Sequence, residues 1–120
     1  MKKVYLAGPM RGIEDFNFPR FFESAKFLRG KGWIVFNPAE RDVAAYGADA
    51  LKTATGSEEE VSRNLGMQGL TLARQCFAVD TNWICHHADA IALLPGWEKS
   101  KGAMAEYHLA VALGLEVIYL

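Results

Sequence analysis

The sequence predicts an α/β fold with a mainly parallel sheet of four to five strands. Short, unbroken apolar runs that end at Gly or Pro are typical of buried strands, and longer segments with apolar residues three or four apart are typical of helices. Along the chain these segments follow the order strand, helix, strand, helical region, strand, helix, strand. Because parallel strands are joined by right-handed helical crossovers, this order indicates a flavodoxin-like or Rossmann-like three-layer sandwich.

Length and composition favour one globular domain that spans residues 1–120. A chain of 120 residues can bury one core, and 51% hydrophobic with 22% charged residues is typical of a globular protein. Thirteen basic and fourteen acidic side chains give a net charge of −1. This balance argues against a nucleic-acid or membrane surface as the partner, and it allows a small charged ligand.

The cysteines and the N-terminal residues predict a cytoplasmic protein. Cys76 and Cys85 fall on one expected helix, nine positions apart, which is too far for a disulfide, so we expect two reduced thiols. The first apolar run, residues 4–7, is shorter than a signal-peptide core, and no later run is long enough to cross a bilayer.

Residues 4–7 form the first expected strand, and a glycine–arginine turn, residues 8–12, follows it at once. Gly8 and Gly12 would let the backbone approach a ligand while the Arg11 guanidinium reaches for an anion. A plain turn is an equally good interpretation. Neither a Walker loop nor a Gly-x-Gly-x-x-Gly motif occurs in the chain.

The first helix is expected to begin near Pro19, a residue suited to the first helical position, and to end at residues 30–32. Its core-facing side chains repeat at helical spacing: Phe21, Phe22, Ala25 and Leu28. Phe16 and Phe18 precede this helix, where they either line a pocket or pack against the helix. Of these two interpretations, packing is favoured.

Residues 33–36 form the second expected strand, which Asn37-Pro38 stops. From residue 39 to residue 56 the pattern has no firm period, so we expect an irregular excursion that could include one short helix, the best place for a mobile flap. Ser57 followed by three glutamates then indicates the capped start of another helix.

A longer helix is expected over residues 70–87. Its apolar stripe includes Phe77 and Ile84 at helical spacing, and Asp80 falls in the middle of that stripe. An aspartate is a poor helix former and stands here where leucine belongs. It is therefore either hydrogen-bonded in a structural network or displayed into a cavity, and both interpretations stay open.

Residues 88–120 predict a strand–loop–helix–strand unit, with strands at residues 89–94 and 117–119 and a helix over residues 102–113. This helix is apolar on nearly every side, so we expect it to be largely buried. Glu106 lies in its second turn. A carboxylate there is either a rim glutamate near the helix N-terminus or is held in a pocket by partners.

Three loops should meet at the carboxyl edge of the sheet: the glycine–arginine turn, Asn37-Pro38 and residues 95–102. Ligands of open α/β sheets bind outside the carboxyl ends of the strands, where the strand order reverses. Ser100 and the free N–H groups behind it would form an anion site at the start of the last helix. Asp80 and Glu106 could face each other across the same crevice.

Three stretches in register carry a resemblance to a known family. They are Tyr5-Leu6-Ala7-Gly8-Pro9-Met10-Arg11-Gly12, then Asp80 with Ala88-Asp89-Ala90-Ile91, then Ser100-x-Gly102-x-x-x-Glu106. In these stretches the chain resembles the nucleoside 2-deoxyribosyltransferase-like superfamily. By motif it is similar to the 2'-deoxynucleoside 5'-phosphate N-hydrolases, and in overall style to phage-associated members.

The resemblance implies a role for each matched residue. Glu106 matches the nucleophile that attacks C1' of the sugar, Asp80 the carboxylate that assists departure of the base, and Tyr5 the hydroxyl that orients the nucleophile. Arg11 and Ser100 match groups that hold a 5'-phosphate. The remaining substrate-binding candidates are Gly8, Met10, Gly12, Gly102 and Trp97. Trp97 either stacks on a base or covers the sheet edge.

The chain departs from the N-hydrolases in two respects. Pro9 replaces a serine, which removes one hydroxyl and one backbone N–H donor. After Leu120 we expect none of the downstream segment that reaches a neighbouring subunit's site in relatives. Relatives resemble dimers, so we expect a homodimer, with the region of Trp83 and Ile84 as a candidate contact.

We expect no cofactor and no metal. His86, His87 and His108 invite a metal interpretation, but adjacent histidines point to different sides of a helix and no ligand spacing is complete. The leading functional hypothesis is an N-glycosidase acting on a (deoxy)nucleoside 5'-monophosphate. The alternatives are a deoxyribosyltransferase that exchanges bases and a non-catalytic nucleotide-binding protein on the same fold.

Overall fold

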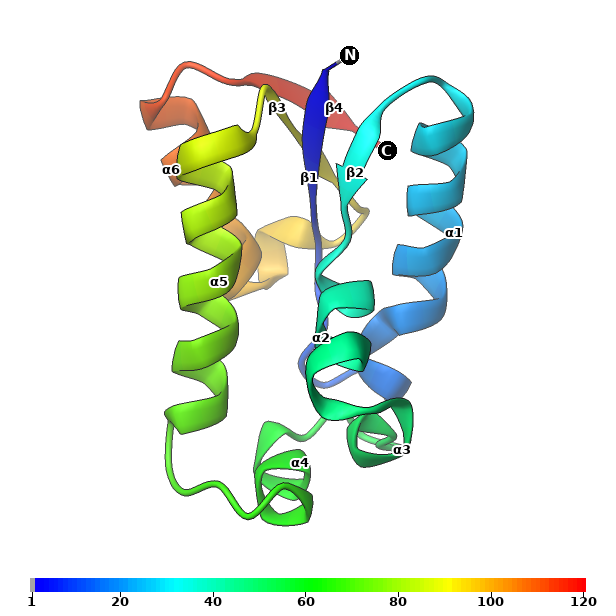
Figure 1. Ribbon diagram of the computed structural model, residues 1–120, viewed down its shortest axis with the longest axis vertical. Coiled ribbons are helices and arrows are strands. Elements are labelled where there is room, and N and C mark those ends of the chain that lie inside the picture. Colours follow the sequence, from blue (N-terminus) through cyan, green and yellow to red (C-terminus); the bar gives the residue numbers. More distant parts are fainter. Residues whose placement is uncertain (1) are drawn as a thin grey trace.

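The computed structural model describes residues 2–120, which form a four-stranded, fully parallel sheet covered by helices (Figure 1). The strands are β1 (Lys3–Ala7), β2 (Ile34–Phe36), β3 (Ala90–Leu93) and β4 (Glu116–Tyr119), in the order β2-β1-β3-β4. The predicted α/β sandwich with a parallel sheet is confirmed, and the sheet has four strands.

The central strand β1 sends alternate side chains into two apolar cores, one on each face of the sheet. Val4 and Leu6 belong to the core that also contains residues of α1 (Phe18–Gly30). Tyr5 belongs to the opposite core, together with residues of α5 (Thr71–His87) and α6 (Lys101–Ala112). Figure 1 shows α1 on one side of the sheet and α5 and α6 on the other.

The sequence prediction for α1 is confirmed. Pro19 stands in the first turn, where its missing N–H costs no hydrogen bond. Phe21, Ala25 and Leu28 are buried against the sheet. The prediction is wrong for Phe22, which remains 41% exposed because it lies beside the buried stripe.

The prediction of an irregular excursion between residues 39 and 56 is wrong. The chain forms two helices there, α2 (Pro38–Tyr46) and α3 (Ala48–Leu51). The Asn37 side chain accepts a hydrogen bond from the Ala39 N–H at 3.0 Å, so Asn37 caps α2 as well as ending β2. Gly47, at φ 87°, ends α2.

The capped start after residue 56 is confirmed as α4 (Glu58–Asn64), whose N-cap Ser57 accepts a hydrogen bond from the Glu60 N–H at 3.2 Å. The helices α5 and α6 also match the predicted positions. Two short 3-10 helices, η1 (Glu14–Asn17) and η2 (Trp97–Lys99), precede α1 and α6.

The expectation that the last helix is largely buried is wrong. Within α6 only Ala103, Glu106 and Ala110 are buried. Val111 and, just after the helix, Leu113 are 49% and 45% exposed. The reason is that α6 forms the outer layer of the sandwich, so only one of its sides contacts the sheet and α5.

Of the two residues expected in the region of a dimer contact, Ile84 packs inside the chain and Trp83 is half-buried. Ile84 is 1% exposed and belongs to the core under α5 and α6. Trp83 is half-buried, and its ring centroid lies 5.0 Å from that of Phe36. Among the helices of residues 2–120, none has both the length and the apolar character required to cross a membrane.

Candidate functional site

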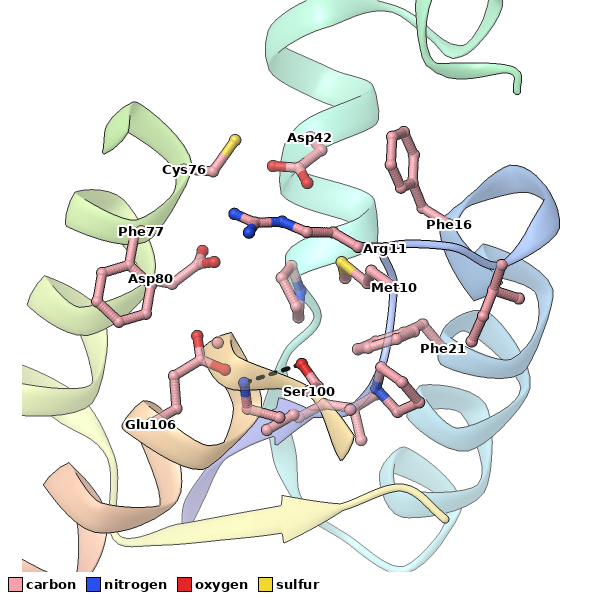
Figure 2. Close-up of a pocket in the computed structure, with 18 of the residues that line it drawn as sticks. Met10, Arg11, Phe16, Phe21, Asp42, Cys76, Phe77, Asp80, Ser100 and Glu106 are labelled. Carbon is pink, nitrogen blue, oxygen red and sulfur yellow. Dashed lines mark hydrogen bonds between the residues drawn. The ribbon is translucent and has the colours of Figure 1, made fainter. Parts of the chain in front are cut away.

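A cavity of about 810 Å³ opens at the carboxyl ends of the strands. Its floor comes from the glycine–arginine turn after β1, and its walls from residues 95–102 after β3 and from α2, α5 and α6 (Figure 2). The chain leaves β1 towards β2 on one side and reaches β3 on the other, so the cavity lies where the strand order reverses.

Glu106 lies at the bottom of this cavity and is held by Tyr5. The Tyr5 hydroxyl donates a hydrogen bond of 2.6 Å to Oε2 of Glu106, and both side chains are buried. Burial raises the pKa of Glu106 to about 8, although the Tyr5 hydrogen bond acts in the opposite direction. Burial also raises the pKa of Tyr5 well above its usual value, so the phenol keeps its proton and remains a donor.

Asp80 projects from the middle of α5 into the same cavity. Its side chain is 8% exposed, and its Oδ1 has no hydrogen-bond partner within residues 2–120. Burial, and next the negative charge of Asp42, raise its pKa to about 7. Figure 2 shows the carboxyl groups of Asp80 and Glu106 both turned into the cavity. The cavity thus contains two carboxyl groups that titrate near neutral pH in different surroundings.

The glycine–arginine turn contributes backbone and one cation. A Cβ on Gly8 would lie 2.7 Å from the Leu94 Cβ, so glycine allows the ends of β1 and β3 to approach. Met10 and Arg11 line the cavity, and Arg11 forms an ion pair with Glu58 of α4. Gly12 does not line it.

Gly12 holds the turn in place instead. Its N–H donates a 3.1 Å hydrogen bond to the Gly56 carbonyl, and its φ of 79° favours glycine. It therefore acts on the shape of the loop rather than on a ligand.

Ser100 lines the cavity as the N-cap of α6. Its Oγ accepts a 3.2 Å hydrogen bond from the Ala103 N–H. The N–H groups of Lys101 and Gly102, in the first turn, have no acceptor inside the helix, and both residues line the cavity. With the positive end of the helix dipole, these groups can hold an anion.

Trp97 lies outside the cavity. Its ring centroid is 4.7 Å from that of Tyr107 and 6.3 Å from that of Tyr119. Trp97 therefore covers the edge of the sheet and is not placed to stack on a base in the cavity. Its indole packs on α6 and β4 rather than at the strand ends.

Phe16 and Phe18 both pack against α1 and line the cavity. They are 6% and 9% exposed in the core beside α1, and they also line the cavity. The histidines do not contribute to the site: His86, His87 and His108 are exposed, and residues 2–120 contain no group of three side chains suited to a metal ion.

Comparison with known proteins places the chain in a family. A family model described as a domain of unknown function, DUF4406, matches residues 2–119. The chain belongs to the DUF4406 family. No curated protein and no solved structure matches it. The family description names no activity, so the function of this DUF4406 domain has to be argued from the geometry of the cavity.

The cavity of this DUF4406 domain contains a third buried carboxyl group, which was not predicted from the sequence. Asp42 of α2 is 8% exposed and lines the cavity beside Cys76. Burial raises the pKa of Asp42 to about 6 and that of the Cys76 thiol to about 12. The sequence signal that could have indicated Asp42 is the pair Asn37-Pro38, which is typical of a helix start. A helix that begins there, directly after β2, places the side chains of its first turns at the carboxyl ends of the strands.

Proposed function

We propose that this protein is an N-glycosidase that cleaves the base–sugar bond of a (deoxy)nucleoside 5'-monophosphate, with Glu106 as the nucleophile. One observation carries the proposal: two buried carboxyl groups, Glu106 with a hydroxyl donor and Asp80 with an unpartnered oxygen, turn into one cavity. Pairs of carboxyl groups with unlike surroundings serve as nucleophile and acid in retaining substitution at a glycosidic carbon.

The position of the proton assigns the two roles. With pKa values of about 7 and about 8, the Asp80–Glu106 pair holds one proton between these pH values. The Tyr5 hydroxyl donates to Glu106 and so favours its carboxylate form. The higher pKa of Glu106 places this proton mainly on Glu106 in the free protein, and the reactive form is the one in which the proton lies on Asp80, whose Oδ1 has no donor among the described residues. Glu106 is then the nucleophile and Asp80 the acid.

The reaction follows in two steps. A Glu106 carboxylate oxygen attacks C1', the C1'–N bond breaks with its electron pair going to the base, and Asp80 gives its proton to the departing base. The product is a glycosyl ester on Glu106. Asp80, now ionised, takes a proton from a water that attacks C1', and the ester bond breaks to release the sugar phosphate and the Glu106 carboxylate.

The 5'-phosphate would bind at the N-terminus of α6. The Lys101 and Gly102 N–H groups and the Ser100 hydroxyl lie there, on the same helix as Glu106 and one to two turns before it. Arg11 can add a charged contact only after its guanidinium leaves Glu58. Pro9 supplies no N–H to this site.

We also propose that the protein acts in the cytoplasm. Both cysteines, Cys76 and Cys85, are free thiols, and Cys85 is exposed. Free thiols of this kind are typical of reducing compartments, where nucleotide pools are also found.

The first test is release of free base, measured by chromatography, from deoxynucleosides and their 5'-monophosphates. We expect the wild type to release base, with monophosphates preferred, and Glu106→Gln to lose at least 10³-fold in kcat because the nucleophile is gone. Glu98→Gln is the matched control, since Glu98 is exposed outside the cavity and should leave the rate unchanged.

Three outcomes would contradict the proposal. Full activity of Glu106→Gln would exclude the nucleophile. Turnover only when a second base is added would indicate a transferase. Nucleotide binding without any release of base would indicate a non-catalytic binding protein.

A further inference from the structure

Asp42 is a buried carboxylate in the cavity that the proposed reaction does not use. It lies on α2, one turn after the Asn37 cap, and is 8% exposed. A buried charged side chain normally has a full set of partners. Here Arg41 donates one long hydrogen bond of 3.4 Å to Oδ1, and the Cys76 thiol is the other side chain whose hydrogen bond favours the charged form of Asp42. A carboxylate can accept about four hydrogen bonds, so Asp42 can still accept one from a ligand in the cavity.

The carboxyl groups follow one another along the cavity in the order Glu106, Asp80, Asp42. The charge of Asp80 acts on Glu106, and the charge of Asp42 acts on Asp80. Figure 2 shows the same sequence of positions, with Asp42 at the end of the cavity away from Glu106. The Asp80 carboxyl group lies between the other two in Figure 2, and its Oδ1 is buried and has no partner among the described residues.

This order determines which part of a bound nucleotide reaches Asp42. The inference rests on the proposed function, because it places the sugar at Glu106. If C1' is at Glu106 and the departing nitrogen is at Asp80, the edge of the base remote from the sugar points towards Asp42. The walls beside it are apolar and include Phe16 and Phe77, which suit the faces of a flat ring. The polar groups at this end of the cavity include Arg11 and Asp42, and Asp42 is the acceptor towards which the edge of the base points.

We propose that Asp42 selects bases that carry an amino group on the edge remote from the sugar, that is, a 6-aminopurine or a 4-aminopyrimidine. An ionised carboxylate accepts hydrogen bonds and donates none, so it attracts an amino group and repels a carbonyl oxygen at the same position. With a pKa raised to about 6, Asp42 is mainly ionised at pH 7.5. Hypoxanthine and uracil carry a carbonyl oxygen where adenine and cytosine carry the amino group.

The test measures binding in the inactive Glu106→Gln background, by calorimetry at pH 7.5, for two matched pairs of ligands: dAMP with dIMP and dCMP with dUMP. We expect the amino member to bind about 10- to 100-fold more tightly in at least one pair. Adding Asp42→Asn should reduce this ratio to about threefold or less, because an amide can donate to the carbonyl oxygen as well as accept. Adding Asp49→Asn, an exposed aspartate of α3, should keep the ratio.

Equal or tighter binding of dIMP and dUMP would overturn the inference, and so would an amino preference that persists in Asp42→Asn. Selective binding of dAMP or dCMP that Asp42→Asn abolishes supports it even if the wild type releases no base, in which case only the glycosidase proposal fails. Release of base with no amino preference refutes the role of Asp42 alone. No binding of any of the four ligands overturns both.

Discussion

In the proposed reaction, Tyr5 is the residue that separates the roles of the carboxyl groups of Asp80 and Glu106. It comes from the central strand, its ring stacks on Phe36 with centroids 5.6 Å apart, and its hydroxyl reaches Glu106 at 2.6 Å. Burial fixes the ring and keeps the phenol protonated. One buried hydroxyl thus stabilises the negative charge on Glu106 that the proposed attack on C1' requires.

The rate should therefore depend on pH with a maximum between about 7 and about 8. Below this range the pair holds two protons and Glu106 cannot attack C1', and above it the pair holds none and Asp80 has no proton to give to the base. Tyr5→Phe should lower kcat about 10- to 100-fold and move the acidic limb to higher pH, because the carboxylate loses its donor. Initial rates from pH 5 to pH 10 for both proteins provide the measurement. An acidic limb at the same pH in Tyr5→Phe would exclude this role.

The same burial has a consequence for stability. The pKa of Glu106 is raised from 4.5 to about 8 in the folded protein, so the folded state binds more protons than the unfolded state between these values. The free energy of unfolding therefore falls as pH rises from about 4.5 to about 8, and it does not recover at higher pH. Asp80 and Asp42, whose pKa values are also raised, act in the same direction.

Glu106→Gln should remove the loss of stability at high pH that the ionisation of Glu106 causes. We expect it to raise the free energy of unfolding by about 1–3 kcal/mol at pH 9 and to change it little at pH 4.5, because the glutamate is then protonated in the folded state and still about half protonated in the unfolded state. Urea unfolding at the two pH values measures the difference. Glu98→Gln, at an exposed site, should show no such dependence. An equal loss of stability at both pH values for Glu106→Gln would contradict the account.

Among the elements, the segment that carries α3 and α4 covers one side of the cavity and is fastened to the loop after β1. The Gly12 N–H bonds to the Gly56 carbonyl at 3.1 Å, and the Asp15 N–H bonds to the Thr53 carbonyl at 2.7 Å. The Arg11–Glu58 ion pair lies beside these bonds. Two segments 38 to 47 residues apart in the sequence thereby form one wall of the cavity.

Gly56 should be essential for this attachment. A Cβ at Gly56 would lie 2.4 Å from the Ile13 nitrogen and 2.5 Å from the Gly12 nitrogen, so Gly56→Ala must displace backbone. Gly66 has nearly the same φ, 70° against 69°, and its Cβ would meet nothing within 4 Å. Gly66→Ala should therefore lower the free energy of unfolding by about 1–2 kcal/mol, which is the cost of a positive φ at alanine. Gly56→Ala should lower it clearly more, and it should also raise the KM.

Thermal unfolding of the two alanine variants and their KM values would measure this difference. Equal changes in stability with an unchanged KM would show that the cover does not depend on the contact between Gly56 and the loop.

On the scale of the whole molecule, the parts that sequence could predict are those whose signals are local. The buried strands end at Gly or Pro, α1 begins at Pro19, and α4 and α6 have serine caps. Asp80 and Glu106 could be recognised because each interrupts an apolar helix face, which is a conflict visible without coordinates.

The remaining features depend on how distant elements meet. The exposure of Val111 follows from the position of α6 in the outer layer, which no local pattern states. The sequence around Asp42 shows no firm hydrophobic period, so its burial could not be predicted locally. Asp42 is buried because α2 lies at the strand ends, on the side of the cavity opposite α5. Trp97 has no local signal that distinguishes a base-stacking indole from one that covers a sheet edge.

The most direct test of the central claim is the detection of the glycosyl ester on Glu106. Incubation with a 2'-deoxy-2'-fluoro nucleoside 5'-monophosphate, whose fluorine destabilises the cationic transition state of both steps, should slow hydrolysis of the ester enough for mass spectrometry of the quenched protein. The account predicts a mass increase equal to the fluorinated sugar phosphate, located on the peptide that contains Glu106 and absent from Glu106→Gln. Release of base by the wild type without any such adduct, or with the adduct on another residue, would contradict it.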